Sequence, residues 1–332
     1  MKGLPGPRYQ DRGEVRVETL IEIATLYYYE DVTQEELSRR FSMSRPKISR
    51  LLQRARADGL VEIRVHQPSS VGAELERFFV DRFGIDRLLV SVDHRDPDAQ
   101  RNAVARLVAA HLEKTLVAGK TVAVGMGRNV AAVADALVTP PRGGVTFVCA
   151  IGGSLRAGEY MNPDHICRRL AARYGGESET LYAPALVTNT MLREELYRND
   201  TVKQTLDRAR RADIALIGIG DLSEDSNMVR MGWFSPQEIA EARLAGTIGD
   251  TMGYDFIDIQ GRPANTGMQG RVIGLSREDL ARIPDVIAIA AENTKAPAIL
   301  GALRTGAINT LATSFTNVHT ILRLDEATRP RD

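Results

Sequence analysis

The sequence predicts an α/β protein with a small N-terminal winged helix-turn-helix domain and a larger, Rossmann-like domain built on a parallel sheet. The chain has 332 residues, which is long for one hydrophobic core, so two domains are expected. Near the N-terminus, short amphipathic helical stretches are joined by a brief break, as in a helix-turn-helix. Beyond residue 85, short strands rich in Val and Ile alternate with helices, which is typical of a parallel sheet with helices on both faces.

Composition divides the chain into four expected segments. Residues 1–14, rich in Gly, Pro and charge, should form a flexible arm, and residues 15–68 the DNA-binding domain. That domain should end in a wing strand at 61–66, where Val and Ile alternate with polar residues. Residues 69–84 are expected to be a linker helix, and residues 85–332 an effector domain.

Residue types mark the ends of the helices in the small domain. A helix is expected at 17–30, and Thr33 with Glu36 has the pattern of a capping box that opens the next one. Ser44 is placed to cap the third helix, and Pro46 lies in its first turn, where a missing N–H costs little. Two short helices joined by a tight turn are therefore predicted, with the third helix in the recognition position.

Charge is concentrated in this domain. Residues 33–66 hold eight Arg and Lys against four Asp and Glu, a net charge of +4, in a chain whose net charge is zero. The alternative is that these residues form a solvated basic face on a small helical subdomain. A local excess of positive charge in a helix-turn-helix of an otherwise neutral chain favours nucleic-acid binding instead. We predict base contacts from Ser44, Arg45, Lys47, Ser49, Arg50 and Arg54, and phosphate contacts from Arg39, Arg40, Arg56 and Arg64.

The segment at 71–83 should be an amphipathic helix with Leu75, Phe78, Phe79 and Phe83 on its apolar side. It could link the domains or form a contact between protomers. Beyond it, strands are predicted at 87–92, 121–127, 145–153, 179–186, 213–220, 286–291 and 309–314, and helices at 98–116, 129–138, 163–175, 201–212 and 296–306. No element is assigned between 221 and 285.

Glycines follow three of these strands. Gly125 and Gly127 precede a helix, Gly152 and Gly153 precede Ser154, and a third pair stands at 218 and 220. Each pair alone could be an ordinary tight turn, but three turns at the carboxyl ends of parallel strands predict one ligand crevice. The first turn lacks the third glycine and the following acidic residue of a dinucleotide site, so no cofactor is expected.

Lysine is rare in this chain, with six against 37 arginines. Lys295 follows the apolar strand at 286–291 and stands at the start of a helix. A cation beside a helix N-terminus suits a phosphate group. A surface lysine is the alternative.

These motifs together resemble the SorC family of bacterial sugar-sensing transcriptional regulators. The similarity extends from about Val17 to Leu324 and is carried by the helix-turn-helix, "IGGS", "ALIGIG", "AGTIGDTMGYDFIDIQGRP", "VIGLSREDL" and "TKAPAILGALRTGAINTLATS". The resemblance implies an effector domain similar to sugar-phosphate isomerases and deaminases, a phosphorylated sugar as effector, and a homo-oligomer, often a tetramer. It also implies that Gly125, Gly127, Arg128, Gly152, Gly153, Ser154, Gly249, Asp250 and Lys295 face the ligand.

The chain departs from the family pattern in the first glycine turn. Family members often carry small hydroxyl residues there, whereas this sequence has Arg128 and Asn129. Near the C-terminus, Ser314 and Phe315 stand where the family usually has an acidic residue. These departures leave the identity of the sugar open, and an unphosphorylated sugar or polyol is the alternative effector.

Other functional classes are not favoured by the sequence. The alternative function is that of a sugar-phosphate isomerase or deaminase with an appended DNA-binding domain. The resemblance implies that such a deaminase carries an acidic residue and a histidine shortly after the "GIG" motif, yet the five histidines of this chain are scattered and none stands there. No metal-ligand spacing is present, and Cys149 and Cys167 are expected to be reduced core residues of a cytoplasmic protein. No signal peptide or long apolar run predicts a membrane association. We expect double-stranded operator DNA, a sugar or sugar-phosphate effector and further copies of this chain as partners. A structural DNA-binding protein without an effector is a third possibility, and the sequence leaves open whether a regulator would repress or activate.

Overall fold

The computed structural model describes residues 15–61, 69–137, 143–223, 226–251, 255–264 and 270–329. The chain divides into two compact units, Met1–His66 and Gln67–Asp332. The predicted arm and all but the first residue of the predicted wing strand lie outside the described residues, as does Arg64.

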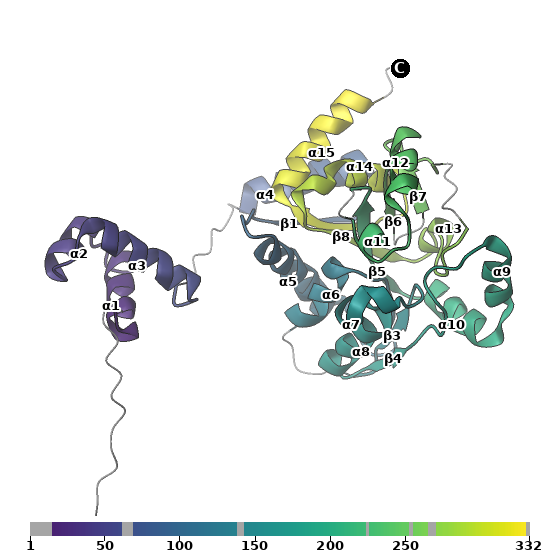
Figure 1. Cartoon of the computed structure of the whole chain (residues 1–332), viewed down its shortest axis with the longest axis horizontal. Helices are drawn as coiled ribbons and strands as arrows, with labels where there is room; N and C mark the ends of the chain where they lie inside the picture. The colour runs from purple at the N-terminus through teal and green to yellow at the C-terminus, as the bar shows by residue number, and fades with distance from the viewer. Residues whose placement is uncertain are drawn as a thin grey trace, which may run out of the picture. The chain divides into compact units, whose positions relative to one another are not determined.

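The small unit contains three helices, α1 (Val17–Tyr28), α2 (Gln34–Arg40) and α3 (Arg45–Ala57) (Figure 1). The helix lengths and the short turn between α2 and α3 confirm the predicted helix-turn-helix. One side of each helix forms the core of the unit, which consists of Leu20, Ile23, Ala24, Leu26, Leu37, Ile48, Leu51, Leu52 and Ala55.

The predicted capping box of α2 and the predicted N-terminal end of α3 are also confirmed, whereas α1 ends two residues before the predicted position. At the start of α2, the Glu36 amide donates to Thr33 Oγ1 at 3.2 Å, and the Thr33 amide donates to Glu36 Oε2 at 3.0 Å, which completes the capping box. Ser44 occupies the N-cap position of α3, although its side chain makes no capping hydrogen bond. Gly59 follows α3 with a φ of +73°, a conformation that suits glycine.

The larger unit is built on seven parallel strands in the order β1-β9-β8-β5-β2-β3-β4. The bounds are β1 (Arg87–Ser91), β2 (Thr121–Val124), β3 (Thr146–Cys149), β4 (Glu177–Glu179), β5 (Ile214–Asp221), β8 (Asp285–Ala290) and β9 (Thr310–Ser314). The predicted parallel sheet is confirmed.

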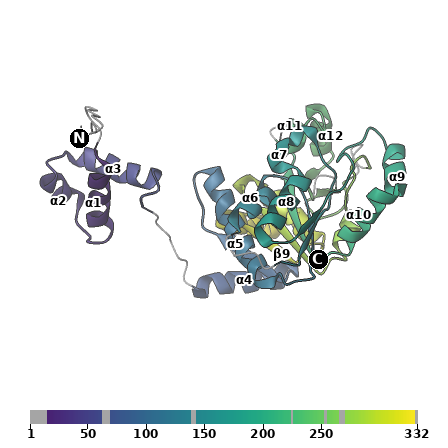
Figure 2. The same cartoon turned by 90° about the horizontal axis from the view of Figure 1, so that it is seen from below.

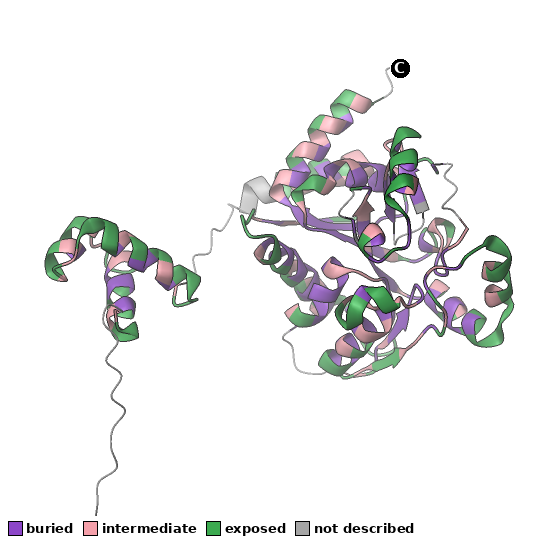
Figure 3. Ribbon diagram, viewed as in Figure 1, coloured by how far each residue is buried: buried purple, intermediate pink, exposed green. Residues whose placement is uncertain are grey.

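Helices cover both faces of this sheet. In Figure 1, α5 (Pro97–Thr115), α6 (Arg128–Ala136) and α8 (Pro163–Tyr174) lie below it, and α14 (Ala296–Arg304) and α15 (Phe315–Thr328) lie above it. The remaining α-helices are α4 (Ser69–Phe83), α7 (Gly158–Met161), α9 (Thr190–Arg198), α10 (Asp200–Arg210), α11 (Asn227–Arg230), α12 (Pro236–Leu244) and α13 (Arg277–Leu280), of which Figure 1 labels α13 and Figure 2 labels the others. Because both faces are covered, the central strands are almost wholly buried (Figure 3).

An antiparallel hairpin that the sequence did not predict pairs with the C-terminal end of β5. It consists of β6 (Thr247–Thr251) and β7 (Asp255–Asp258), and β6 pairs with the second half of β5. The predicted turn at 218–220 is therefore wrong, since β5 continues through both glycines. A Cβ at Gly220 would lie 2.0 Å from Asp250 Oδ1, so this glycine permits the close approach of β6 rather than a turn.

The strand predicted at 179–186 is also wrong in its extent. Only Glu177–Glu179 forms a strand, and the following residues make isolated bridges, such as the one between Gly153 and Pro184. Pro184 has no N–H to donate to a ladder, which explains why regular pairing does not continue.

Helix α4 packs against the rest of the larger unit. Phe79 is fully buried in that unit's core, Leu75 and Phe83 are partly buried, and Phe78 is 56% exposed. The helix therefore presents one apolar side to the core, while Phe78 remains available for another contact. No helix among the described residues combines the length and apolarity that a membrane span requires.

Candidate functional site

The recognition helix α3 presents its cations away from the core. Arg45, Lys47 and Arg50 are exposed, whereas Ile48 and Leu52 are buried on the opposite side. Ser44 is exposed at the N-terminal end of the helix, and Ser49 is partly buried. The first two turns of α3 thus carry an exposed face of hydrogen-bond donors, at the end of the helix that enters the major groove in a helix-turn-helix.

Arg54 differs from the other cations of this face. Its Nε lies 3.2 Å from Asp58 Oδ2, one turn further along the helix. This ion pair compensates part of its charge, so the N-terminal cations are better placed for DNA. The predicted phosphate-binding residues Arg39, Arg40 and Arg56 are all exposed.

The larger unit has a crevice of about 240 Å³ at the carboxyl ends of β2 and β5. The chain runs outward in one direction from β2 to β3 and β4, and in the other from β5 to β8 and β9, so the two strands form the switch point of the sheet. Open α/β sheets bind their ligands at this place. The crevice is lined by Met126, Gly127, Arg128, Asn129, Met161, Gly218, Ile219, Gly220, Asp221, Ser223, Ser226, Met228, Arg230, Met231, Trp233, Asp250, Glu292, Thr294 and Lys295.

Four of the predicted effector residues line this crevice: Gly127, Arg128, Asp250 and Lys295. Gly125 lies just behind them and donates its amide to Leu216 O at 2.8 Å within the sheet. Gly249 has a packing role, because a Cβ there would lie 2.5 Å from Ala298 Cβ of α14.

The second glycine turn lies beside a neighbouring cavity. Gly153 and Ser154 line that cavity, whereas Gly152 packs against the backbone of Pro184. Trp233 connects the two places, since it lines both cavities and its Nε1 donates to Ser154 Oγ at 3.2 Å. Ser154 therefore contacts Trp233, which lines the crevice, but does not line the crevice itself.

One wall of the crevice is charged and tightly bonded. Lys295 Nζ lies 3.1 Å from Glu292 Oε2 and donates to Ile219 O at 2.8 Å. Asn129 Nδ2 donates to the same Glu292 oxygen at 2.9 Å, and a guanidinium nitrogen of Arg101 lies 3.6 Å from Glu292 Oε1. Burial alone would raise the pKa of Glu292, but the charge of Lys295 and the bond from Asn129 outweigh it and lower the pKa to about 2.

Arg128 is the first residue of α6, directly after Gly127, which has a φ of +111°. Its Nε is buried without a hydrogen-bond partner among the described residues, and no carboxylate in that part of the chain forms an ion pair with it. The oxygens Asn129 Oδ1 and Ser226 Oγ are likewise buried at the crevice and unbonded within the described residues. Such groups are costly unless ordered water or a ligand satisfies them.

The crevice also has an apolar lining. Four of the chain's nine methionines, and its only tryptophan, line the crevice. The sequence prediction did not include them or Glu292. The position of Glu292 directly after β8 was a usable signal, because polar residues at strand ends face ligands in such sheets. The residues around Trp233 lie in the region where no element had been assigned.

No histidine is among the described residues that line the crevice. No three His, Cys, Asp or Glu side chains gather in a way that could hold a metal ion within the described part of the chain. Cys149 and Cys167 are buried free thiols with their sulfurs 3.7 Å apart.

Comparison with known proteins assigns both units. Residues 68–323 match the sugar-binding domain family, and residues 23–69 match the MarR family. The transcriptional regulator LsrR of Klebsiella pneumoniae is 27% identical over 326 residues, which cover 96% of each chain.

Similar solved structures include those of two regulators. The full-length sorbitol operon regulator SorC from Klebsiella pneumoniae superposes with a TM-score of 0.70 and 26% identity, over 93% of this chain and all of that one. The sugar-binding domain of a transcriptional repressor from Vibrio fischeri has a TM-score of 0.71 and 50% identity, over 76% of this chain and 99% of that one. The chain therefore belongs to the sugar-binding domain family, and with its MarR-type N-terminal region it is a DNA-binding transcriptional regulator of the SorC and LsrR type.

Proposed function

We propose that this protein binds operator DNA through α3 and that a phosphorylated sugar or polyol in the crevice of the larger unit controls that binding. The observation that carries the proposal is the pairing, in one chain, of an exposed basic recognition helix with a crevice that holds Arg128 at a helix N-terminus. The name of the related sorbitol operon regulator supports a sugar or polyol as the class of effector.

The phosphate group should bind at the start of α6. Amides at a helix N-terminus point at bound anions, and Arg128 adds a guanidinium that no carboxylate of the described residues compensates. Lys295 borders the same crevice and supplies a second cation. The hydroxyl groups of the effector would then meet Asp250, Glu292 and Asn129, which offer acceptors and an amide on the charged wall.

An enzymatic activity is not part of the proposal. The related proteins are named as transcriptional regulators, and the described residues of the crevice offer no histidine for proton transfer. The carboxylate of Glu292, with its pKa near 2, is held ionised and is a poor general acid at neutral pH.

We propose further that the protein acts in the cytoplasm as a homo-oligomer, a dimer or a tetramer, on double-stranded DNA. A single helix-turn-helix contacts only a few base pairs, and specific operators are usually read by two related half-sites. Phe78 of α4 is an exposed aromatic residue beside the core and is available for a contact between protomers.

A thermal-shift screen tests the effector. Sorbitol 6-phosphate, erythritol 4-phosphate, ribose 5-phosphate and fructose 6-phosphate would be compared with their unphosphorylated counterparts. A compound at one hundred times its Kd stabilises the native state by about 2.7 kcal/mol, which is a clear rise in Tm. We expect at least one phosphate to stabilise the wild type and not the Arg128→Ala variant. If sugar phosphates and free sugars all leave Tm and operator binding unchanged, the protein is a DNA-binding protein without a sugar effector.

A further inference from the structure

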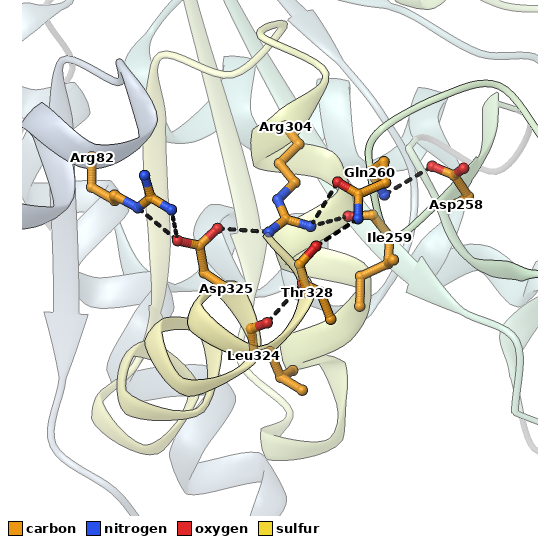
Figure 4. A network of polar contacts seen from close by, with 8 residues as sticks. All are labelled: Arg82, Asp258, Ile259, Gln260, Arg304, Leu324, Asp325 and Thr328. Carbon is orange, nitrogen blue, oxygen red and sulfur yellow. Dashed lines mark hydrogen bonds and ion pairs between the residues drawn. The ribbon is translucent and has the colours of Figure 1, made fainter. Parts of the chain in front are cut away.

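The carboxylate of Asp325 lies between two arginine side chains from different helices (Figure 4). Arg82 of α4 donates through Nε to Asp325 Oδ2 at 2.6 Å, and a second nitrogen of the same guanidinium contacts that oxygen. Arg304, the last residue of α14, donates to Asp325 Oδ1 at 2.7 Å. The side chain of Asp325 is only 5% exposed.

We propose that Asp325 is a positioning residue for regulation: it couples α14, whose N-terminal end borders the crevice at Lys295, to α4, the first helix after the DNA-binding unit. This inference rests on the proposed function, because it names the route by which an effector in the crevice reaches the DNA-binding side of the chain. Neither Arg82 nor Asp325 lines the crevice or belongs to the DNA-binding unit.

The contacts of Arg304 extend the connection to a fourth segment. Besides Asp325, this guanidinium donates to Ile259 O at 2.8 Å and to Gln260 Oε1 at 3.3 Å. Gln260 in turn donates to Thr328 O at 2.8 Å, at the end of α15. The network therefore joins α4, α14, α15 and the turn that follows β7, as the dashed lines in Figure 4 show.

Helix α14 is suited to transmit a displacement because it is short and closely packed. Seven of its nine residues are buried, and nine residues span only about 13 Å. A Cβ at Gly301 would lie 2.7 Å from Asp258 O, and a Cβ at Gly249 of β6 would lie 2.5 Å from Ala298 Cβ, so neither position has room for a side chain. The helix thus moves together with the hairpin that carries Asp250 into the crevice. Closely packed elements shift as bodies rather than deform continuously.

Helix α4 receives the displacement near its C-terminal end. Phe79 is fully buried, its ring centroid lies 4.6 Å from that of Phe83, and Glu76 Oε1 accepts from the Leu88 amide at 3.4 Å. Arg82 lies in the last turn of this fifteen-residue helix. A small rotation about this anchored end moves the other end of α4 the most, and that end leads to the DNA-binding unit in the chain.

Hydrogen–deuterium exchange on the full chain without any ligand tests the linkage. The variants are Asp325→Asn, which leaves two guanidinium groups facing each other, and Arg82→Ala, which removes only the α4 side. Asp213→Asn is the matched control, because Asp213 pairs with Lys120 at 2.6 Å in the same unit but outside this network. Asp325→Glu serves as the conservative rescue.

We expect both network variants to speed exchange at least tenfold in the first turn of α14 and in β6, while the control leaves these amides within twofold of wild type. A purely local role would speed exchange only in α4, in α15 and in the turn after β7. That result, with the first turn of α14 unchanged in both variants, would overturn the proposal. Since no sugar phosphate is present, the outcome is independent of whether the crevice binds one.

The regulatory consequence is then measured with whichever of the four sugar phosphates in the screen stabilises the wild type. In Arg82→Ala, we expect the ratio of operator affinities with and without this compound to fall toward one, while the affinity for the compound changes less than threefold. An unchanged ratio would show that α4 receives the signal by another route. A loss of compound binding would show instead that the substitution disturbs the crevice, which also contradicts a positioning role.

Discussion

Lys295 is paired with Glu292 across 3.1 Å at the border of the crevice, and its ammonium also donates to the backbone of β5. The sequence alone presents this lysine as the principal phosphate-binding cation. The structure shows that its charge is compensated by a neighbouring carboxylate, whereas Arg128 has no carboxylate partner among the described residues. An incoming phosphate must share Lys295 with Glu292 but can bind Arg128 without competition.

Both substitutions should therefore weaken the effector, to different degrees. We expect Arg128→Ala to cost about 1.5–3 kcal/mol of effector binding, the usual range for a hydrogen bond to a charged group, and Lys295→Ala to cost less. Neither should change DNA binding without effector. Calorimetry with the phosphate selected by the screen measures both. Wild-type affinity in Lys295→Ala would remove that residue from the site, and a loss of DNA binding would make it structural.

The pKa of Glu292 predicts a pH dependence of stability. Its pKa is lowered from 4.5 to about 2, so its contribution is present above pH 4.5 and is lost as the pH falls toward 2. At roughly 1.4 kcal/mol per pKa unit, the upper limit of this contribution is about 3 kcal/mol. Urea denaturation should show the wild type more stable than Glu292→Gln at pH 7, with the gap narrowing as the pH falls from 5 to 2. A gap that stays constant over this range would contradict the assigned pKa.

The exposed cations at the start of α3 should carry DNA affinity. We expect Lys47→Ala or Arg50→Ala to lower operator affinity by about 1–3 kcal/mol without unfolding the protein, and binding to weaken steeply with salt. Fluorescence anisotropy on labelled operator measures both effects. The control is Arg106→Ala, which removes an exposed cation from α5 of the larger unit. Normal binding by both α3 variants would exclude this face as the DNA interface.

Two glycines near the crevice should respond differently to the same change. In Gly249→Ala the new Cβ would lie 2.5 Å from Ala298 Cβ and 2.7 Å from Gly220 O, so we expect a loss of about 1–3 kcal/mol in the free energy of unfolding. In Gly153→Ala the nearest atom is Asn162 Oδ1 at 3.5 Å, and the change should stay within about 0.5 kcal/mol. Urea denaturation measures the free energy of unfolding of both variants. Equal losses would show that the room around each glycine does not determine the cost of the substitution.

Light scattering tests the proposed assembly. We expect a dimer or tetramer at micromolar concentration and an operator with two related half-sites. The variant Phe78→Ser removes the exposed aromatic side chain of α4 and leaves the buried Phe79 in place. A monomeric wild type that binds one half-site per chain would contradict the proposal.

Local patterns explain what the sequence could predict. The capping box of Thr33 and Glu36 involves residues three positions apart, and the sequence shows it without any tertiary information. The strand, glycine turn and helix around Gly127 are also local, and the structure confirms them. The resemblance to a family supplied the residues of the hairpin, although no pattern of strands in that region had been identified.

Contacts between distant residues explain what the sequence could not predict. The sequence predicts a turn at Gly220, because a glycine in a turn and a glycine under a neighbouring strand cannot be distinguished from the sequence alone. Only the pairing with Asp250, thirty positions away, distinguishes them. The ion pair of Lys295 and Glu292 joins residues three positions apart, so the sequence could have predicted it. The position of Trp233 at the crevice could not be predicted, because the surrounding segment has no regular hydrophobic periodicity.

The pairing of β1 with β9 has a consequence for how the chain folds. These strands are neighbours in the sheet, yet Arg87 and its partner Thr310 are 223 residues apart in the sequence (310 − 87). Closing so long a loop is slow. Until β9 is available, the edge strand β1 has no native partner and is prone to pair incorrectly. During synthesis, the three helices of the small unit need only nearby residues and can fold early. The pair of β1 and β9 must wait until the ribosome has delivered almost the entire chain, so a nascent protein can hold a folded DNA-binding unit before its larger unit is complete.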